Sequence, residues 1–432
     1  MEGEFIHELG KEIAVLWIIP FIGLLLSIAF VPLIAPHFWE SNKNKGIIAT
    51  IFGLPVAIFV GIKDIHELEH VVVEYFSFIT LLAALFIISG GIYLKGDIRA
   101  KPTTNAFFLL VGSVLANFIG TTGASMLLIR AVLRTNRERR NIRHIPVFFI
   151  FLVSNIGGSL LPIGDPPLFL GYLEGVPFFW TLKLFPVWTF EVSIVLLIFL
   201  VFDTIAYKSE PVYVLAFDKA AVQPLRIEGV INFVWLLGVL LSAIFLHTPL
   251  REAVMWIMAL LSWVTTSKET RKGNEFTFHP IIEVAVLFAG IFGAMIPCLL
   301  ILKARGGELG INQPWQFLWA TGTLSSFLDN APTYLTFLSL SQGVTNSLAL
   351  PQDIMVRGGG VMEMYLKAIS VGAVFMGANT YIGNAPNFMV KAISDEWKFK
   401  TPSFVGYMLW SMTILIPTFL LVTLVFFNVE IK

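Results

Sequence analysis

Two aspartates lie inside apolar segments of the sequence, each beside residues that interrupt helices. Asp165 directly precedes two prolines in SNIGGSLLPIGDPPLFLGYL (Ser154–Leu173), and Asp329 lies in SFLDNAPTYLTF (Ser326–Phe337). Proline removes a backbone donor and breaks helices, and a carboxylate in apolar surroundings costs free energy unless it has a partner. Carboxylates at such breaks are typical of sites that bind a small cation or a proton.

Neutral oxygen donors accompany these aspartates at four expected helix breaks. Amide side chains lie in the same two segments and in GANTYIGNAPNFMV (Gly377–Val390), and two threonine hydroxyls lie in NFIGTTGASMLL (Asn117–Leu128). Hard cations prefer oxygen ligands, so we expect a cation- and proton-binding site that holds Na⁺ in the region of Asp165 and Asp329. Its candidate residues are Thr121, Thr122, Asn155, Asp165, Asp329, Asn330, Asn379 and Asn384.

Two glutamates within or near apolar segments are candidates for a proton relay. Glu191 lies deep in its segment, whereas Glu283 lies close to the polar start of its own and alternatively faces the membrane interface. Ionisable residues inside membrane segments mark ion or proton pathways by default.

The stretch HELEH (His66–His70) matches the H-E-x-x-H pattern of zinc proteases, so an intramembrane metalloprotease must be weighed. The pattern lies in the charged stretch KDIHELEHVVVE, between two hydrophobic segments, and the chain has no clear third ligand motif. An amphipathic helix at the membrane interface explains it better, and His66 or His70 could there sense pH.

The composition places the chain in a membrane. Of its 432 residues, 56% are hydrophobic and 13% are charged, whereas soluble proteins have roughly 25% charged residues. About eleven to thirteen hydrophobic segments predict an all-α polytopic protein. The single cysteine excludes an internal disulfide, and the net charge of zero gives no sign of nucleic-acid binding. No nucleotide-binding motif accompanies the segments, so any transport should be secondary rather than ATP-driven.

The two halves of the chain carry matching motifs with opposite flanking charge. IGDPPLF in the first half and IGNAPNF in the second share Ile, Gly, Pro and Phe. The first-half loop, Arg130–His144, holds six arginines and one glutamate, and we expect it to be cytoplasmic; the second-half loop, 341–363, has one arginine, Arg357. This asymmetry predicts two inverted-topology repeats with re-entrant hairpins near 103–129 and 314–341 and with broken helices. The expected organisation is an N-terminal transmembrane helix in 1–45, a first repeat over 46–207, a polar linker over 208–228 and a second repeat over 229–432.

At its four motifs the sequence resembles the ion transporter superfamily, in particular NhaD-type sodium/proton antiporters and the citrate transporters grouped with them. The resemblance covers residues 46–428 and implies a scaffold domain, often dimeric, and a transport domain with two re-entrant hairpins and two unwound helices. Related divalent-anion symporters carry Ser-Asn-Thr at the hairpin tips and a Gly-Thr-Pro-Pro-like turn. Here the second tip reads Asp329-Asn330-Ala331 and the turn reads Gly164-Asp165-Pro166-Pro167. In each of these two motifs an aspartate stands where the related symporters have a neutral residue, and it adds a carboxylate.

These departures favour exchange of cations over uptake of a carboxylate. Two carboxylates would repel a di- or tricarboxylate, and no arginine lies in the four motifs to bind one. We therefore expect a secondary active transporter, not an enzyme, that exchanges Na⁺ or Li⁺ for H⁺. A Na⁺- or H⁺-coupled citrate or dicarboxylate symporter is the alternative, because bound sodium could neutralise the aspartates, and the intramembrane metalloprotease is a remote one.

The same reasoning gives the partners. We expect a multi-pass homodimer in the lipid bilayer of the cell (inner) membrane that binds small inorganic cations and protons and no nucleic acid. No cofactor is expected beyond Na⁺ as the transported or coupling ion.

Overall fold

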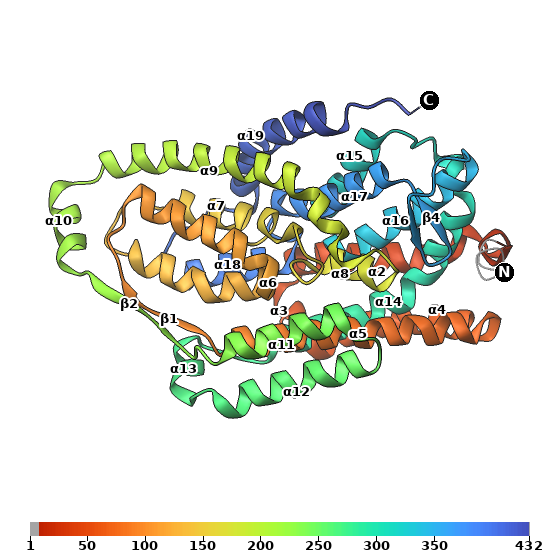
Figure 1. Ribbon diagram of the computed structural model, residues 1–432, viewed down its shortest axis with the longest axis horizontal. Helices are drawn as coiled ribbons and strands as arrows, with labels where there is room; N and C mark the ends of the chain where they lie inside the picture. Colours follow the sequence, from red (N-terminus) through yellow and green to blue (C-terminus); the bar gives the residue numbers. More distant parts are fainter. Residues whose placement is uncertain (1–7, 432) are drawn as a thin grey trace.

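The computed structural model describes residues 8–431; residues 1–7, the start of the expected N-terminal segment, lie outside the described residues. Helices dominate the fold (Figure 1), and within the described residues seven helical stretches are long and apolar enough to cross a membrane. The chain is an all-α polytopic membrane protein, as its composition predicts. These stretches are Val15–Pro32, Asn42–Lys63, Ile65–Ser89, Pro102–Thr135, Phe178–Lys208, His279–Leu309 and Phe404–Phe427.

One row of helices, the lower layer in Figure 1, is built on close contacts between small residues. A Cβ atom added to Gly53 would lie 2.8 Å from the carbonyl oxygen of Gly290, and one added to Gly290 would lie 2.6 Å from the Cβ of Ala49. Small residues let membrane helices approach closely and gain dispersion contacts. The layer consists of α4 (Asn42–Lys63), α5 (Ile65–Ser89), α11 (Asn232–Phe245), α12 (Leu250–Thr265) and α14 (His279–Arg305).

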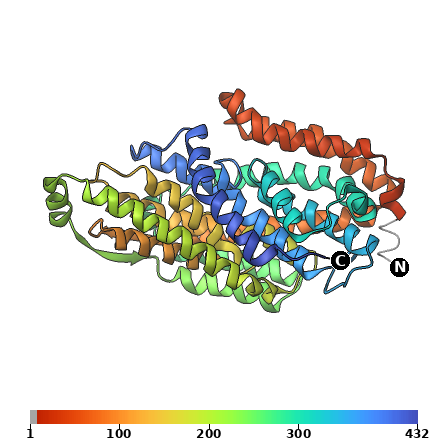
Figure 2. The same ribbon diagram turned by 90° about the horizontal axis from the view of Figure 1, so that it is seen from above.

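The N-terminal helices border this layer. Figure 2 shows α2 in red along one edge of the molecule, where it packs on α4 and α14. The elements here are η1 (Val15–Ile18), α2 (Ile19–Ile34) and α3 (Pro36–Trp39).

The upper layer contains the motifs singled out in the sequence, and several of its helices are interrupted. The expected hydrophobic segments 145–173, 314–341 and 364–391 each form two helices rather than one. The helices are α6 (Pro102–Thr135), α7 (His144–Leu152), α8 (Pro166–Leu173), α9 (Phe185–Lys208), α15 (Pro314–Ser325), α16 (Asn330–Ser347), α17 (Glu363–Met376), α18 (Ala385–Glu396) and α19 (Phe404–Val422). Short turns are η2 (Ile156–Ser159), η3 (Phe178–Leu184), η4 (Gly306–Leu309), η5 (Gly377–Asn379) and η6 (Thr423–Phe427).

Two small antiparallel ribbons lie in the connections. The stretch 208–228, expected as a linker, forms α10 (Val212–Ala220) and β2 (Gln223–Glu228). Strand β2 pairs with β1 (Tyr93–Asp97), so this stretch is hydrogen-bonded to the first half of the chain. The second ribbon pairs β3 (Ile354–Val356) with β4 (Gly359–Val361), and α13 (Lys268–Gly273) follows α12.

The two broken helices run in opposite directions. In Figure 1, the chain passes from α7 on the left to α8 toward the right, and from α17 on the right to α18 on the left. The basic loop 130–144 lies near α10, because the backbone N–H of Arg140 donates to Glu210 and its guanidinium to Tyr213. That end of the molecule is opposite the end that carries β4, as an inverted arrangement of the two halves requires.

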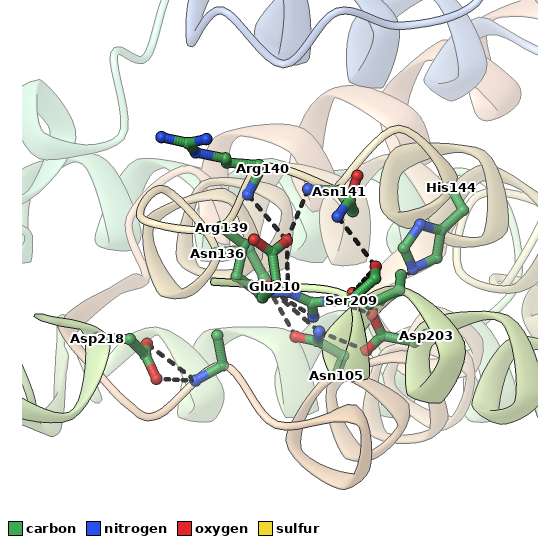
Figure 3. Close-up of polar contacts among 12 residues, drawn as sticks. Asn105, Asn136, Arg139, Arg140, Asn141, His144, Asp203, Ser209, Glu210 and Asp218 are labelled. Carbon is green, nitrogen blue, oxygen red and sulfur yellow. Dashed lines mark hydrogen bonds and ion pairs between the residues drawn. The ribbon is translucent and has the colours of Figure 1, made fainter. Parts of the chain in front are cut away.

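A buried polar network fixes the end of the upper layer near α10 (Figure 3). Asp203 of α9 accepts hydrogen bonds from Asn105 at 2.8 Å and lies 2.6 Å from the guanidinium of Arg139 and 2.9 Å from the imidazole of His144. The side chains of Arg139 and Asp203 are fully buried. Such a pair is costly to break, because the partner that remains is a buried and uncompensated charge.

We expect Asp203→Ala to destabilise the folded protein by about 3–5 kcal/mol, the usual cost of leaving one member of a buried ion pair alone. Thermal unfolding of the detergent-purified protein, followed by tryptophan fluorescence, measures the change. Arg305→Ala is the matched control, because it breaks the exposed pair with Glu308 and should leave unfolding nearly unchanged. Equal effects of the two substitutions would contradict the assignment of Asp203 as an anchor.

Cysteines placed at Arg137 and at Asn346 should be labelled from opposite sides of the membrane. Both positions are exposed; Arg137 lies in the loop after α6, and Asn346 lies in the last turn of α16, close to the loop that carries β3 and β4. The only native cysteine, Cys298, is buried, so a Cys298→Ser background gives clean single-cysteine variants. A membrane-impermeant maleimide applied to oriented vesicles makes the measurement. Labelling of both positions from one side would refute the inverted arrangement.

Candidate functional site

Helix α6 is a hairpin whose tip is Gly120. Gly120 has φ 76° and ψ 154°, a backbone conformation that an L side chain rarely adopts. On either side of the tip the chain folds back on itself, because the side-chain amides of Asn105 and Asn136 exchange hydrogen bonds of 2.9 and 2.7 Å. A Cβ on Gly112 would likewise lie 3.0 Å from the side chain of Leu128. The tip therefore presents Thr121 at the start of the returning arm.

A second turn joins α15 to α16 at residues 326–329. Helix α15 ends at Ser325 and α16 begins at Asn330, with Asp329 as its N-cap. The Asp329 carboxylate accepts from the backbone N–H of Ala331 at 3.0 Å, which satisfies one free donor of the first turn. Asn330 is thereby placed at the N-terminus of a helix, where the helix dipole favours negative charge.

The two broken helices have the same backbone geometry at the break. Asp165, the N-cap of α8, has φ −142° and ψ 141°, and Asn384, the N-cap of α18, has φ −152° and ψ 141°. Each is followed by proline at the first or second position of the helix, where the missing N–H costs nothing. Asp165 and Asn384 therefore occupy equivalent positions in the two halves.

All four breaks converge on the Asp165 carboxylate. Thr121 Oγ1 and Asn330 Nδ2 each donate to it at 2.7 Å, from the first hairpin tip and the second turn. Asn384 Nδ2 donates at 3.3 Å from the opposite broken helix. Asp165 is 1% exposed. One buried carboxylate thus has three neutral donors, each from a different break.

Asn155 joins this cluster through the two broken helices. Its Nδ2 donates to Asn387 Oδ1 at 2.7 Å, and its Oδ1 accepts from Asn384 Nδ2 at 3.2 Å. Asn387 in turn donates to the backbone oxygens of Gly377 and Thr380, two groups left free by the break. These bonds repair the interrupted backbone and align the two breaks.

The other three candidate residues make no hydrogen bond to the Asp165 side chain within the described residues. The Asp329 side chain accepts from the backbone N–H of Ala331, and the next residue, Asn330, is the one that donates to Asp165. Asn379 donates to Ser326 Oγ at 2.9 Å. Thr122 is half-buried and makes no hydrogen bond to Asp165 within the described residues.

Two buried amide oxygens at the site have no hydrogen-bond partner among residues 8–431. They are Asn330 Oδ1 and Asn379 Oδ1. A buried acceptor without a partner is costly, and a neutral oxygen beside a carboxylate is a ligand that a hard cation accepts. Within the described residues, no lysine or arginine is hydrogen-bonded or ion-paired to Asp165.

The candidate relay residues lie in different places. Glu191 is fully buried, accepts from Thr418 Oγ1 of α19 at 2.6 Å, and has a second oxygen without a partner. Glu283 forms an ion pair of 2.8 Å with the buried Lys45 of α4, so it joins two lower-layer helices away from the breaks.

Sequence reasoning missed Asn387 and Asn117. Both amides bond to the free backbone at a break; Asn117, for example, donates to Gly157 O at 2.7 Å and accepts from Leu160 N at 2.7 Å. Their position within the motifs NFIGTTGASMLL and GANTYIGNAPNFMV was the only available signal.

The HELEH stretch does not assemble a protease centre from its two histidines. The His66 side chain is 88% exposed and pairs with Glu69, whereas His70 lies beside Glu74. Among the described residues, the group of His, Cys, Asp and Glu close enough to share a metal contains His70 but not His66.

A comparison with protein families agrees with the motifs. The family model described as "Putative citrate transport" matches residues 10–427, nearly the whole chain. A search of curated proteins finds no significant match. The match confirms the resemblance to citrate-transporter-type ion transporters, and together with the apolar helices it indicates a multi-pass membrane transport protein. The chain belongs to the family described as putative citrate transport.

Proposed function

We propose that this transporter exchanges Na⁺ for protons, and that the two ions compete for Asp165. The observation that carries the proposal is the Asp165 carboxylate, which is buried at the meeting point of four helix breaks and hydrogen-bonded to neutral side chains only. Hydrogen bonds from neutral donors reduce the cost of a buried charge but do not cancel it. A proton or a cation cancels it, and either one can leave again.

The groups around Asp165 suit a small hard cation. Asn330 holds the carboxylate through its Nδ2 while its Oδ1 has no partner, so rotation of the amide would offer an oxygen to an ion bound at Asp165. Asp329 would supply a second carboxylate, and Thr121 a hydroxyl oxygen. Na⁺ and Li⁺ are hard cations and suit a set of carboxylate, amide and hydroxyl oxygens, whereas softer metal ions prefer other ligand atoms.

The second candidate function is Na⁺- or H⁺-coupled symport of citrate or a dicarboxylate. The family description favours it. The charges at the breaks oppose it, because recognition of a carboxylate substrate normally uses arginine or lysine, and Asp165 and Asp329 would repel the substrate until a cation neutralised them.

We further propose that the protein is a homodimer in the cell (inner) membrane, with the loop 130–144 in the cytoplasm. The proposed function needs no cofactor other than Na⁺ as the transported or coupling ion. The six arginines of that loop support the orientation. Glu191 is a second proton-binding candidate, because one of its oxygens is buried without a partner.

Asp165→Asn and Asp329→Asn should each abolish or strongly reduce Na⁺/H⁺ exchange while the protein still folds. Asparagine keeps the shape and one oxygen of aspartate but cannot release a proton in the working pH range. In the wild type, the apparent Na⁺ affinity should weaken as pH falls, because a protonated carboxylate no longer attracts the ion. Asp395→Asn is the matched control: Asp395 lies on α18, which begins at Asn384, but pairs with Lys391 near the surface. Full exchange by Asp165→Asn would rule out the proposed role.

A flux assay in proteoliposomes separates the two candidate functions. The vesicles contain a pH-sensitive dye and receive Na⁺, Li⁺, K⁺ or citrate. We expect proton movement on addition of Na⁺ or Li⁺ without any organic anion, and none with K⁺. Citrate-dependent Na⁺ uptake, with no proton movement on addition of Na⁺ alone, would replace the antiporter with the symporter.

A further inference from the structure

Three side chains with metal-binding atoms meet where the lower layer contacts the upper layer. His70 and Glu74 lie one turn apart on α5, and Glu174 follows directly after α8. One ligand atom from each lies within 4.8 Å of the other two. Residues four apart on a helix share a face, so α5 presents an imidazole and a carboxylate together to the end of α8.

His70 and Glu74 line a cavity of about 350 Å³ that is also lined by Ser77, His247 and Arg251, and Glu174 lies between the lining residues Leu173 and Gly175. Glu74 and Glu174 are each 6% exposed. His70 Nε2 lies 3.1 Å from Glu74 Oε1, a contact at ion-pair distance, and within the described residues these two atoms have no other hydrogen-bond partner. The imidazole and the buried carboxylate therefore face each other beside this cavity.

Glu74 forms its ion pair with a histidine, whereas the carboxylates around it pair with arginine or lysine, and the charge of Arg357 also acts on Glu74. Glu67 is paired with Arg357 at 2.6 Å, and Glu252 with Arg251 at 2.6 Å. Glu174 has Lys303 at 3.9 Å. Within the described residues, the cationic group in ion-pair distance of Glu74 is His70, and histidine carries a full charge only when it is protonated.

We propose that His70, Glu74 and Glu174 bind a divalent transition-metal ion of the Zn²⁺ type. One imidazole nitrogen and two carboxylate oxygens form a ligand set suited to Zn²⁺ or Co²⁺. Three protein ligands would leave at least one coordination position free, and the cavity lined by His70 and Glu74 has room for a further ligand there.

The ion would act as a lock. It would tie α5 in the lower layer to α8 in the upper layer, and α8 begins at Asp165. This consequence rests on the proposed exchange function and adds one premise to it, that α8 moves relative to α5 during the transport cycle. The binding of metal rests on neither. Zn²⁺ bound here inhibits transport by holding the two layers together.

Isothermal titration tests the site itself. Zn²⁺ is added to the full-length, chelator-treated protein in detergent. We expect saturable binding by the wild type and by His66→Ala, a matched control on the same helix whose side chain is exposed. His70→Ala and Glu174→Gln should each bind at least roughly tenfold more weakly, because loss of even an outer-shell partner of a metal ligand costs about 10–100-fold in affinity. The absorption spectrum of bound Co²⁺ reports the coordination in the wild type without relying on any variant.

The outcomes are distinct. No saturable Zn²⁺ binding by the wild type, or equal affinities in all four proteins, overturns the site. Zn²⁺ should also inhibit Na⁺-driven proton flux in the wild type and in His66→Ala, with reversal by chelator, and should inhibit His70→Ala only at correspondingly higher concentration. Metal binding without inhibition of an active transporter overturns the lock. A protein that exchanges no Na⁺ under any condition refutes the proposed function, and the titration still decides the site.

Discussion

A carboxylate buried without a cationic partner is the constraint on which this structure depends. Asp165 is held by Thr121, Asn330 and Asn384, and each donor reaches it only because a helix is interrupted at that point. The interruptions in turn leave backbone groups free, which Asn117 and Asn387 bind. The helix breaks, the asparagine amides that bind the free backbone groups and the Asp165 carboxylate thus depend on one another.

The contrast with Asp203 shows why the partner's charge matters. Both aspartates are buried, and both accept a hydrogen bond from asparagine. Asp203 also faces Arg139 and His144, so its charge is compensated within the protein and it serves as a fixed anchor (Figure 3). Asp165 has no such cation among its described contacts, and in the proposed function an exchangeable ion compensates its charge. The same residue type therefore stabilises one end of the upper layer and is the candidate ion-binding group at its centre.

Much of the site could be predicted from the sequence because the breaks are local. Proline beside Asp165 and glycine at position 120 mark the interruptions, and the match between IGDPPLF and IGNAPNF predicts that Asp165 and Asn384 are equivalent. Asn387 and Glu174 could not be predicted, because their roles depend on contacts with residues far away in the chain; Asn155 and Asn387, for example, are separated by 232 positions. The HELEH spacing was uninformative for a related reason. Residues at i and i+4 share a helix face, but the tertiary fold directs His70 toward Glu174 and leaves His66 exposed.

Competition between Na⁺ and H⁺ at Asp165 is the central claim, and proton release by the purified protein measures it most directly. Wild-type protein in weakly buffered detergent solution receives NaCl while a pH indicator records the free protons, with choline chloride as the control for ionic strength. We expect Na⁺ to release protons from the wild type and to release none from Asp165→Asn. Absence of release from the wild type across its working pH range, or equal release from the variant, would contradict it.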